Sequence, residues 1–182
     1  AAMVTPEGYI FLFDNGNNKS KNKENYISAE NSYSRGVIYK IDTENKTIEQ
    51  VYQYGKERGS DFYSPYISDV DYLETNHYLI SSGGIVKKDG VPQNQPSSVA
   101  GANELLSDTV EIKDGEVIFE IKLNSNTYRA EKLSAYYEGE NFELTESKKL
   151  GHLAKSEPIS VETGLLSGTK SIDNEYKKHN IE

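Results

Sequence analysis

The fold class is decided by one stretch, Gly36-Val-Ile-Tyr-Lys-Ile41, Asp42-Thr-Glu-Asn-Lys46 and Thr47-Ile-Glu-Gln-Val-Tyr-Gln-Tyr54. Its two outer runs are rich in β-branched and aromatic residues, and the link between them is short and polar. This pattern is typical of a β-hairpin with a five-residue loop. We therefore predict strands at 36–41 and 47–54 that are joined by a turn at 42–46.

Similar short runs occur on both sides of this hairpin. Each has strand length and is bounded by turn-forming residues, and the predicted strands are 9–13, 69–73, 77–80, 110–112, 117–123 and 127–133. The run at 77–80 is expected to end at Ser81-Ser-Gly-Gly84. Two long polar segments, 15–34 and 85–103, are predicted as loops.

The order of these pieces repeats at an offset of roughly 70 residues. An apolar run that ends in a glycine turn occurs at 8–16 and again at 77–84, and a hairpin follows at 36–54 and at 109–123. Four short antiparallel strands per repeat is typical of a propeller blade. Two hairpin units of an ordinary β-sandwich or meander fit the pattern equally well, so the residues alone predict an all-β fold and leave both architectures open.

Composition excludes several classes of function. The chain has 182 residues, 14 of them Tyr, and a formal net charge of −9. Such a surface repels phosphate backbones and anionic lipids, so neither nucleic acid nor a membrane is an expected partner. The absence of Cys excludes thiol catalysis, disulfides and thiolate metal sites. No apolar run is long enough to span a bilayer.

Candidate chemical residues are few. His77, His152 and His179 are the only histidines, and their spacing does not form a metal site. We interpret His77, which follows a turn, as a surface residue. The richest segment is 54–72, which combines cations, hydroxyls and phenol rings that suit an anionic aromatic ligand. A surface turn shaped by Pro65 is the alternative, and the residues alone favour it.

Several motifs resemble one known family. They are Phe13-Asp-Asn-Gly-Asn17, the segments 33–42 and 47–59, Phe62-Tyr-Ser-Pro65 with Ser68, Phe119-Glu-Ile-Lys-Leu123 and Tyr128-Arg-Ala-Glu131. In order and spacing, residues 1–137 are similar to bacterial arylsulfate sulfotransferases. The resemblance implies a six-bladed propeller, of which this chain would supply about two to three blades. It also implies transfer of a sulfuryl group from an aryl sulfate to a phenol, through a sulfohistidine and without an adenylyl-sulfate cofactor.

The family's nucleophilic His precedes the strand that ends in Phe-Asp-Asn-Gly, a place that falls at or before Ala1 here. We therefore expect no catalytic residue in this chain, no metal, and no activity of the fragment alone. The resemblance suggests Ser68 for a polar channel residue of the family. With the polar residues near it, the candidate substrate-binding set is Ser68, Tyr66, Asn15 and Arg58.

Structural roles are the alternative for several of these residues. Asp14 and Asn15 have short polar side chains that suit capping of a strand end. Arg35 and Arg129 suit ion pairs between strands.

The remaining expectations concern organisation. Residues 138–182 are predicted as a C-terminal extension that forms a weak strand, a helix or an edge-covering tail. Open sheet edges predict a homo-oligomer or a covered edge. The resemblance implies a periplasmic or secreted parent with a phenolic sulfate donor and a phenol acceptor as partners. A non-catalytic, propeller-like binding or structural module remains the alternative function.

Overall fold

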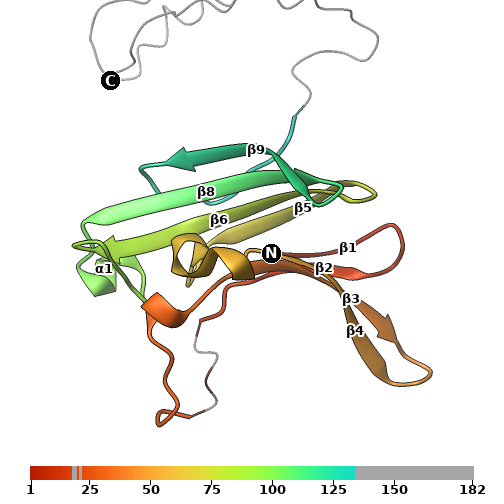
Figure 1. The fold of residues 1–182 in the computed structure, drawn as a ribbon, viewed down its shortest axis with the longest axis horizontal. Coiled ribbons are helices and arrows are strands. Elements are labelled where there is room, and N and C mark those ends of the chain that lie inside the picture. The colour runs from red at the N-terminus through yellow and green to blue at the C-terminus, as the bar shows by residue number, and fades with distance from the viewer. Residues whose placement is uncertain (18–19, 21, 134–182) are drawn as a thin grey trace, which may run out of the picture. The chain divides into compact units, whose positions relative to one another are not determined.

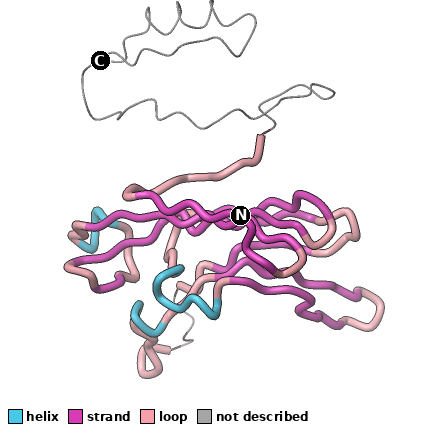
Figure 2. The backbone as a smooth tube through the Cα atoms, turned by 45° about the horizontal axis from the view of Figure 1, so that its top comes forward, coloured by secondary structure: helices cyan, strands magenta, loops and turns pink. Residues whose placement is uncertain are grey.

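Two antiparallel β-sheets make up the described part of the chain (Figure 1). The structure is a computed structural model that describes residues 1–17, 20 and 22–133. Strands dominate, and the helices are short: η1 (Ala29–Asn31), η2 (Lys56–Phe62) and α1 (Ser97–Ala100) (Figure 2). The predicted all-β class is confirmed.

The first sheet has the order β1-β2-β3-β4. Its strands are β1 (Ala2–Val4), β2 (Ile10–Asp14), β3 (Arg35–Asp42) and β4 (Thr47–Tyr54). The predicted hairpin is confirmed, because β3 pairs with β4 from Asp42 opposite Thr47 to Gly36 opposite Tyr54. Its turn is stabilised by Asp42, whose carboxylate accepts hydrogen bonds from the backbone N–H groups of Glu44 and Asn45.

The second sheet has the order β5-β6-β8-β9, with β7 also paired to β6. Its strands are β5 (Ser68–Glu74), β6 (His77–Lys88), β7 (Val91–Pro92), β8 (Glu104–Lys113) and β9 (Glu116–Leu123). The prediction that β6 ends at Ser81–Gly84 is wrong. The strand continues because β8 pairs with it on both sides of the two glycines, with a shift of register between Ser82 and Ile85.

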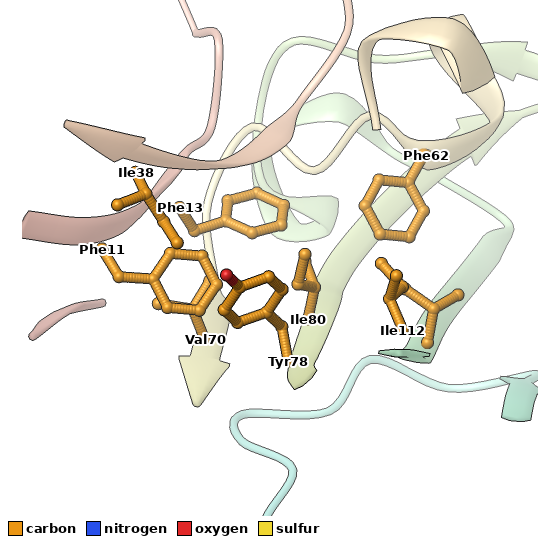
Figure 3. Close-up of a cluster of buried hydrophobic side chains, with 9 residues drawn as sticks. Phe11, Phe13, Ile38, Phe62, Val70, Tyr78, Ile80 and Ile112 are labelled. Carbon is orange, nitrogen blue, oxygen red and sulfur yellow. The ribbon is translucent and has the colours of Figure 1, made fainter. Parts of the chain in front are cut away.

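The two sheets repeat one topology, as the sequence offset predicts. The strands β1 to β4 correspond in order to β5, β6, β8 and β9. The sheets pack through a common core whose side chains come from both of them, and Figure 3 shows these side chains converging. Two antiparallel sheets, each with a run of four consecutive antiparallel strands and the second with the short β7 added, are consistent with neighbouring propeller blades.

Phe62 at the end of η2 closes this core. Its side chain is fully buried, and its ring centroid lies 6.2 Å from that of Phe13 in the first sheet. On the second sheet, Ile80, Val110 and Ile112 are likewise buried in the same cluster. The link between the sheets is therefore part of the core, and this fixes the segment that follows it.

Two further predictions about local structure are wrong. Segment 85–103 is not one loop, because it contains the end of β6, all of β7 and helix α1. Segment 127–133 is not a strand. Thr127 and Arg129 to Leu133 line a pocket with Leu79 and Phe119 of the second sheet. Residues 126–133, here called the strap, therefore lie over the sheet face rather than along an edge.

The outer strand β9 is exposed along its whole length, including Phe119 and Ile121. Association through open edges stays a prediction. Among the described residues there is no helix of the length and apolarity that a membrane crossing requires. The weak strand, helix or tail predicted within 138–182 lies outside the described residues.

Candidate functional site

A pocket of about 280 Å³ lies where β2 ends and β5 begins. It is lined by Asn15, Ile67, Ser68, Asp69, Tyr128 and Arg129, among others. Two of the four predicted substrate-binding residues, Asn15 and Ser68, thus meet in one place although 53 positions separate them. We call this the Ser68 pocket.

Asn15 joins the two sheets at this pocket. Its side-chain amide donates hydrogen bonds to the carbonyl oxygens of Ser64, at 2.8 Å, and Tyr66, at 3.0 Å. Its own side-chain oxygen accepts a longer bond of 3.4 Å from the Ser68 hydroxyl. Asn15 therefore organises the loop that enters β5, in line with the structural alternative.

Two buried serines complete this arrangement. The Ser34 hydroxyl donates to the Asn15 carbonyl at 2.7 Å and accepts from the Ser64 amide at 2.9 Å. The Ser64 hydroxyl oxygen lies 2.7 Å from the carbonyl oxygens of both Tyr66 and Ile67, so its single hydrogen is shared between them. It also accepts from the Gly84 amide at 2.8 Å. Both serines are completely buried.

The double glycine of β6 lets other segments approach closely. A Cβ atom on Gly83 would lie 2.1 Å from the Thr127 carbonyl oxygen, and one on Gly84 would lie 3.0 Å from both the Ser64 hydroxyl and the Tyr66 carbonyl. The strap and the 64–67 loop thus reach the β6 backbone because these two positions carry no side chain.

Tyr66 forms a bridge between the walls of the pocket rather than lining it. Its hydroxyl donates to the side-chain oxygen of Asn126 at 2.6 Å. The Asn126 amide in turn donates to the carbonyls of Ile85 and Leu106, in the irregular part of the β6–β8 ladder. The strap and the 64–67 loop are therefore tied to each other as well as to the sheet.

Charges at the Ser68 pocket come from Asp69 and Arg129. One Asp69 carboxylate oxygen lies 3.3 Å from Arg129 Nε, within ion-pair distance but without hydrogen-bond geometry. Burial raises the pKa of Asp69 although Arg129 opposes it, and burial also raises the pKa of neighbouring Asp71. The predicted ion pair between strands is present for Arg35, whose Nε lies 3.2 Å from Asp14, whereas Arg129 pairs with Asp69 from the strap and not from a strand.

Arg58 lies elsewhere. It binds Asp108 at 2.9 Å and Glu120 at 2.7 Å, beside a separate pocket of about 600 Å³. Burial raises the pKa of Asp108 to about 6 in spite of the Arg58 charge. The structure therefore does not bring Arg58 together with Ser68 and Asn15, and two carboxylates already engage its guanidinium.

His77 is buried, so its interpretation as a surface residue is wrong. Its Nδ1 lies 2.9 Å from Glu74 and its Nε2 lies 2.6 Å from Glu111, which explains how the ring is accommodated inside the sheet. This end of β5 is six residues from Ser68, or roughly 20 Å. In the described ranges, no three His, Cys, Asp or Glu side chains are grouped as a metal ion would need.

The Ser68 pocket offers a hydroxyl and a guanidinium, which can bind oxygen atoms of an anion and the polar edge of an aromatic ring, whereas both amide hydrogens of Asn15 are already donated to backbone carbonyls. Sequence reasoning did not identify Ser34, Ser64 or Asn126 as parts of this network. Each of them has a partner that is 19 to 60 positions away, and the only signals were short polar residues beside strand ends.

Comparison with known proteins agrees with this architecture. The family model described as Arylsulfotransferase (ASST) matches residues 1–136. The chain is 36% identical over 129 residues to arylsulfate sulfotransferase AssT of Escherichia coli O6:H1, and 34% identical over 129 residues to that of Lelliottia amnigena.

Each alignment covers 71% of this chain and 21% of the relative, so the chain spans about a fifth of the length of these curated relatives. With a family model that matches about three quarters of its residues, the chain belongs to the arylsulfotransferase family.

Proposed function

We propose that this chain is part of an enzyme that transfers a sulfuryl group from an aryl sulfate to a phenol, and that the Ser68 pocket forms one part of its substrate site. One observation supports this most directly. In a chain of the arylsulfotransferase family, Asn15 and Ser68 come from different sheets and meet in a single pocket. Polar side chains gathered from distant segments into a concavity are the usual composition of a small-molecule site.

The reaction that we propose has two halves. In the first, a histidine nitrogen attacks sulfur, the bond from sulfur to the phenolic oxygen breaks, and the departing phenolate takes up a proton. In the second, the acceptor phenol gives up its proton, its oxygen attacks the same sulfur, and the bond from nitrogen to sulfur breaks. The sulfuryl group moves intact, so no oxidant or adenylyl-sulfate cofactor is needed.

The role that we assign to the Ser68 pocket is to hold oxygen atoms. The bond from Ser68 to Asn15 is long, so the Ser68 hydroxyl can turn to donate to a sulfuryl oxygen or to the phenol. Arg129 is more than half exposed, and its guanidinium brings positive charge to the pocket although Asp69 and Glu131 partly neutralise it. Donors fixed before the substrate arrives stabilise negative charge without reorganisation.

The nucleophile would lie outside the described residues. His77 is the one histidine among them, and two carboxylates occupy its ring nitrogens at the far end of β5. We therefore propose that this chain alone does not catalyse the transfer, and that the two sheets are blades of a six-bladed propeller in a periplasmic or secreted protein.

The test uses the full-length protein with 4-nitrophenyl sulfate as donor and phenol as acceptor. We expect release of 4-nitrophenolate to depend on the acceptor and to fall roughly 10- to 100-fold in Ser68→Ala. Ser98→Ala on the exposed surface is the matched control and should behave as the unmodified protein. Binding of the aryl sulfate without any sulfated phenol would instead support the alternative, a non-catalytic binding module.

A further inference from the structure

We propose that Ile67 and Ser64 are positioning residues for the Ser68 pocket: a strained backbone at Ile67, held by the Ser64 hydroxyl, fixes Ser68 opposite Asn15. The inference rests on the proposed function, because it assigns a role within the same site. It assigns a role to the serine of the Phe62-Tyr-Ser-Pro65 motif and to Ile67, which lies outside the motifs that resemble the family.

The conformation of Ile67 is the first observation. Its φ is +33°, in the left-handed region that L-residues with a branched Cβ rarely adopt. The other non-glycine residues with positive φ are Lys46, Asn76, Asp89 and Asp114, which are polar and lie in hairpin turns or beside a turn glycine. Ile67 is therefore the outlier of the described residues. Backbone strain of this kind is maintained only where the surroundings enforce it.

The surroundings of Ile67 do enforce it. The Ser64 hydroxyl is 2.7 Å from the carbonyl oxygens of Tyr66 and Ile67, which lie one on each side of the Ile67 Cα, and the Gly84 amide of β6 donates to the same hydroxyl. Asn15 adds a hydrogen bond to the Tyr66 carbonyl. The Ile67 side chain itself is confined, since a Cβ on Gly83 would lie 3.1 Å from its Cγ2.

The consequence falls on the next residue. Ser68 begins β5 directly after the strained link, so the direction of its side chain follows from the Ile67 backbone. If Ile67 relaxed to negative φ, Ser68 would leave Asn15, which contacts it only through a 3.4 Å bond. Ser64 acts through the backbone and does not touch substrate, because it is completely buried.

The test compares variants of the full-length protein in pairs. Ile67→Ala removes the side chain but keeps the strain, whereas Ile67→Gly removes both. We expect kcat/KM of Ile67→Gly to be roughly 10- to 100-fold below that of Ile67→Ala, while its Tm is equal or higher because the left-handed conformation no longer costs energy. A residue that is merely structural would show activity and Tm falling together.

Two control variants match these changes away from the pocket. Lys46→Gly removes a positive-φ side chain in the β3–β4 turn, and Ser81→Ala removes a buried hydroxyl that is bonded to Thr109. Both should leave kcat/KM unchanged. Ser64→Ala should lower Tm by about as much as Ser81→Ala does, but only Ser64→Ala should also lower kcat. Equal kcat/KM in Ile67→Gly and Ile67→Ala overturns the inference.

Hydrogen exchange at the Gly84 amide provides a readout that does not need catalysis. Because this amide donates to Ser64, its exchange should be faster in Ser64→Ala and Ile67→Gly than in Ile67→Ala. If the full-length protein shows no sulfuryl transfer, the proposed function is wrong. Hydrogen exchange at the Gly84 amide then tests the positioning role of Ile67 and Ser64 without any activity measurement. Equal exchange in the two Ile67 variants would overturn it.

Discussion

The two ends of strand β5 are held in place by different kinds of interaction. At one end, here called the pocket end, the side chains of Asn15, Ser34 and Ser64 bind backbone groups of residues 15 and 64–67. At the other, the ionic end, His77 lies between Glu74 and Glu111, and Lys113 and Lys132 bind the same carboxylates.

This contrast indicates which end of β5 is better suited to form a substrate site. Hydrogen bonds from neutral side chains to buried carbonyls fix the backbone itself, and they do not change between pH 4 and pH 9. Pairs of charged side chains fix side-chain positions, and those near solvent weaken in salt and at low pH. A substrate site needs fixed donors, so the pocket end has the more suitable construction.

The largest expected effect comes from the core that both ends share. Phe62→Ala removes a fully buried ring beside Phe13 and Tyr54, and we expect the free energy of unfolding to fall by about 3–5 kcal/mol. Urea-induced unfolding measures it. Phe119→Ala on the exposed face of β9 is the control, and an equal loss in both variants would contradict the assigned core.

The next largest loss of stability is expected from a substitution at the pocket end alone. Asn15→Asp places a carboxylate against two carbonyl oxygens that now accept from an amide, so we expect a loss of about 1–3 kcal/mol at pH 7. The loss should shrink as the pH falls, since a protonated carboxyl can donate again. Asn17→Asp, which replaces a single bond from the exposed Asn17 to the Pro65 carbonyl, should cost less. Stability measured from pH 3 to pH 8 distinguishes the two variants.

The ionic end should respond to pH in the unmodified chain. Lys132 first, and then His77, lower the pKa of Glu111, which has an ordinary value of 4.5. As the pH falls below about 4.5, the unfolded chain takes up this proton first, so stability that is present above that pH is lost. Glu111→Gln should cost about 1–2 kcal/mol at pH 7 and flatten this part of the curve. The exposed Glu49→Gln should leave the curve unchanged, and a slope in Glu111→Gln equal to that of the unmodified chain would refute the assignment.

The smallest effect is expected at the exposed ion pair between Lys113 and Glu74, in which Nζ lies 2.6 Å from the carboxylate oxygen Oε1. Lys113 lowers the pKa of Glu74, but both side chains are about half exposed. Lys113→Ala should therefore lower Tm slightly in low salt and not at all near 1 M salt, where the screening length is about 3 Å. Lys88→Ala near the other end of β6 is the control. A salt-independent loss in Lys113→Ala would indicate packing rather than charge.

Much of the fold could be predicted from local pattern. The hairpin 36–54 and the strands around 9–13 and 117–123 alternate or cluster apolar residues between turn formers, and this pattern is sufficient to identify them. Prediction failed at Gly83-Gly84 and at 127–133. Two glycines normally end a strand, but here β8 continues the ladder past them, and the strap has strand-like residues without a strand to pair with.

The site was predictable only in part. Asn15 and Ser68 were identified, and they do meet. Tyr66 and Arg58 were equally plausible by residue type, but their side chains bind Asn126 in one case and Asp108 with Glu120 in the other. Residue type shows what a side chain can bind, and only the tertiary structure determines which partner it has.

Strand periodicity and composition are local properties, so the amino-acid pattern alone specifies the all-β class, the repeat of two similar strand sets, and the acidic surface without thiols. Only the tertiary structure decided that β6 passes through its glycines, that His77 is buried between carboxylates, and that Ser64 holds Ile67 in a left-handed conformation. The physical reason is that these features depend on contacts between segments some 20 to 50 positions apart. Such contacts exist only in the folded arrangement, in which both sheets pack on Phe62.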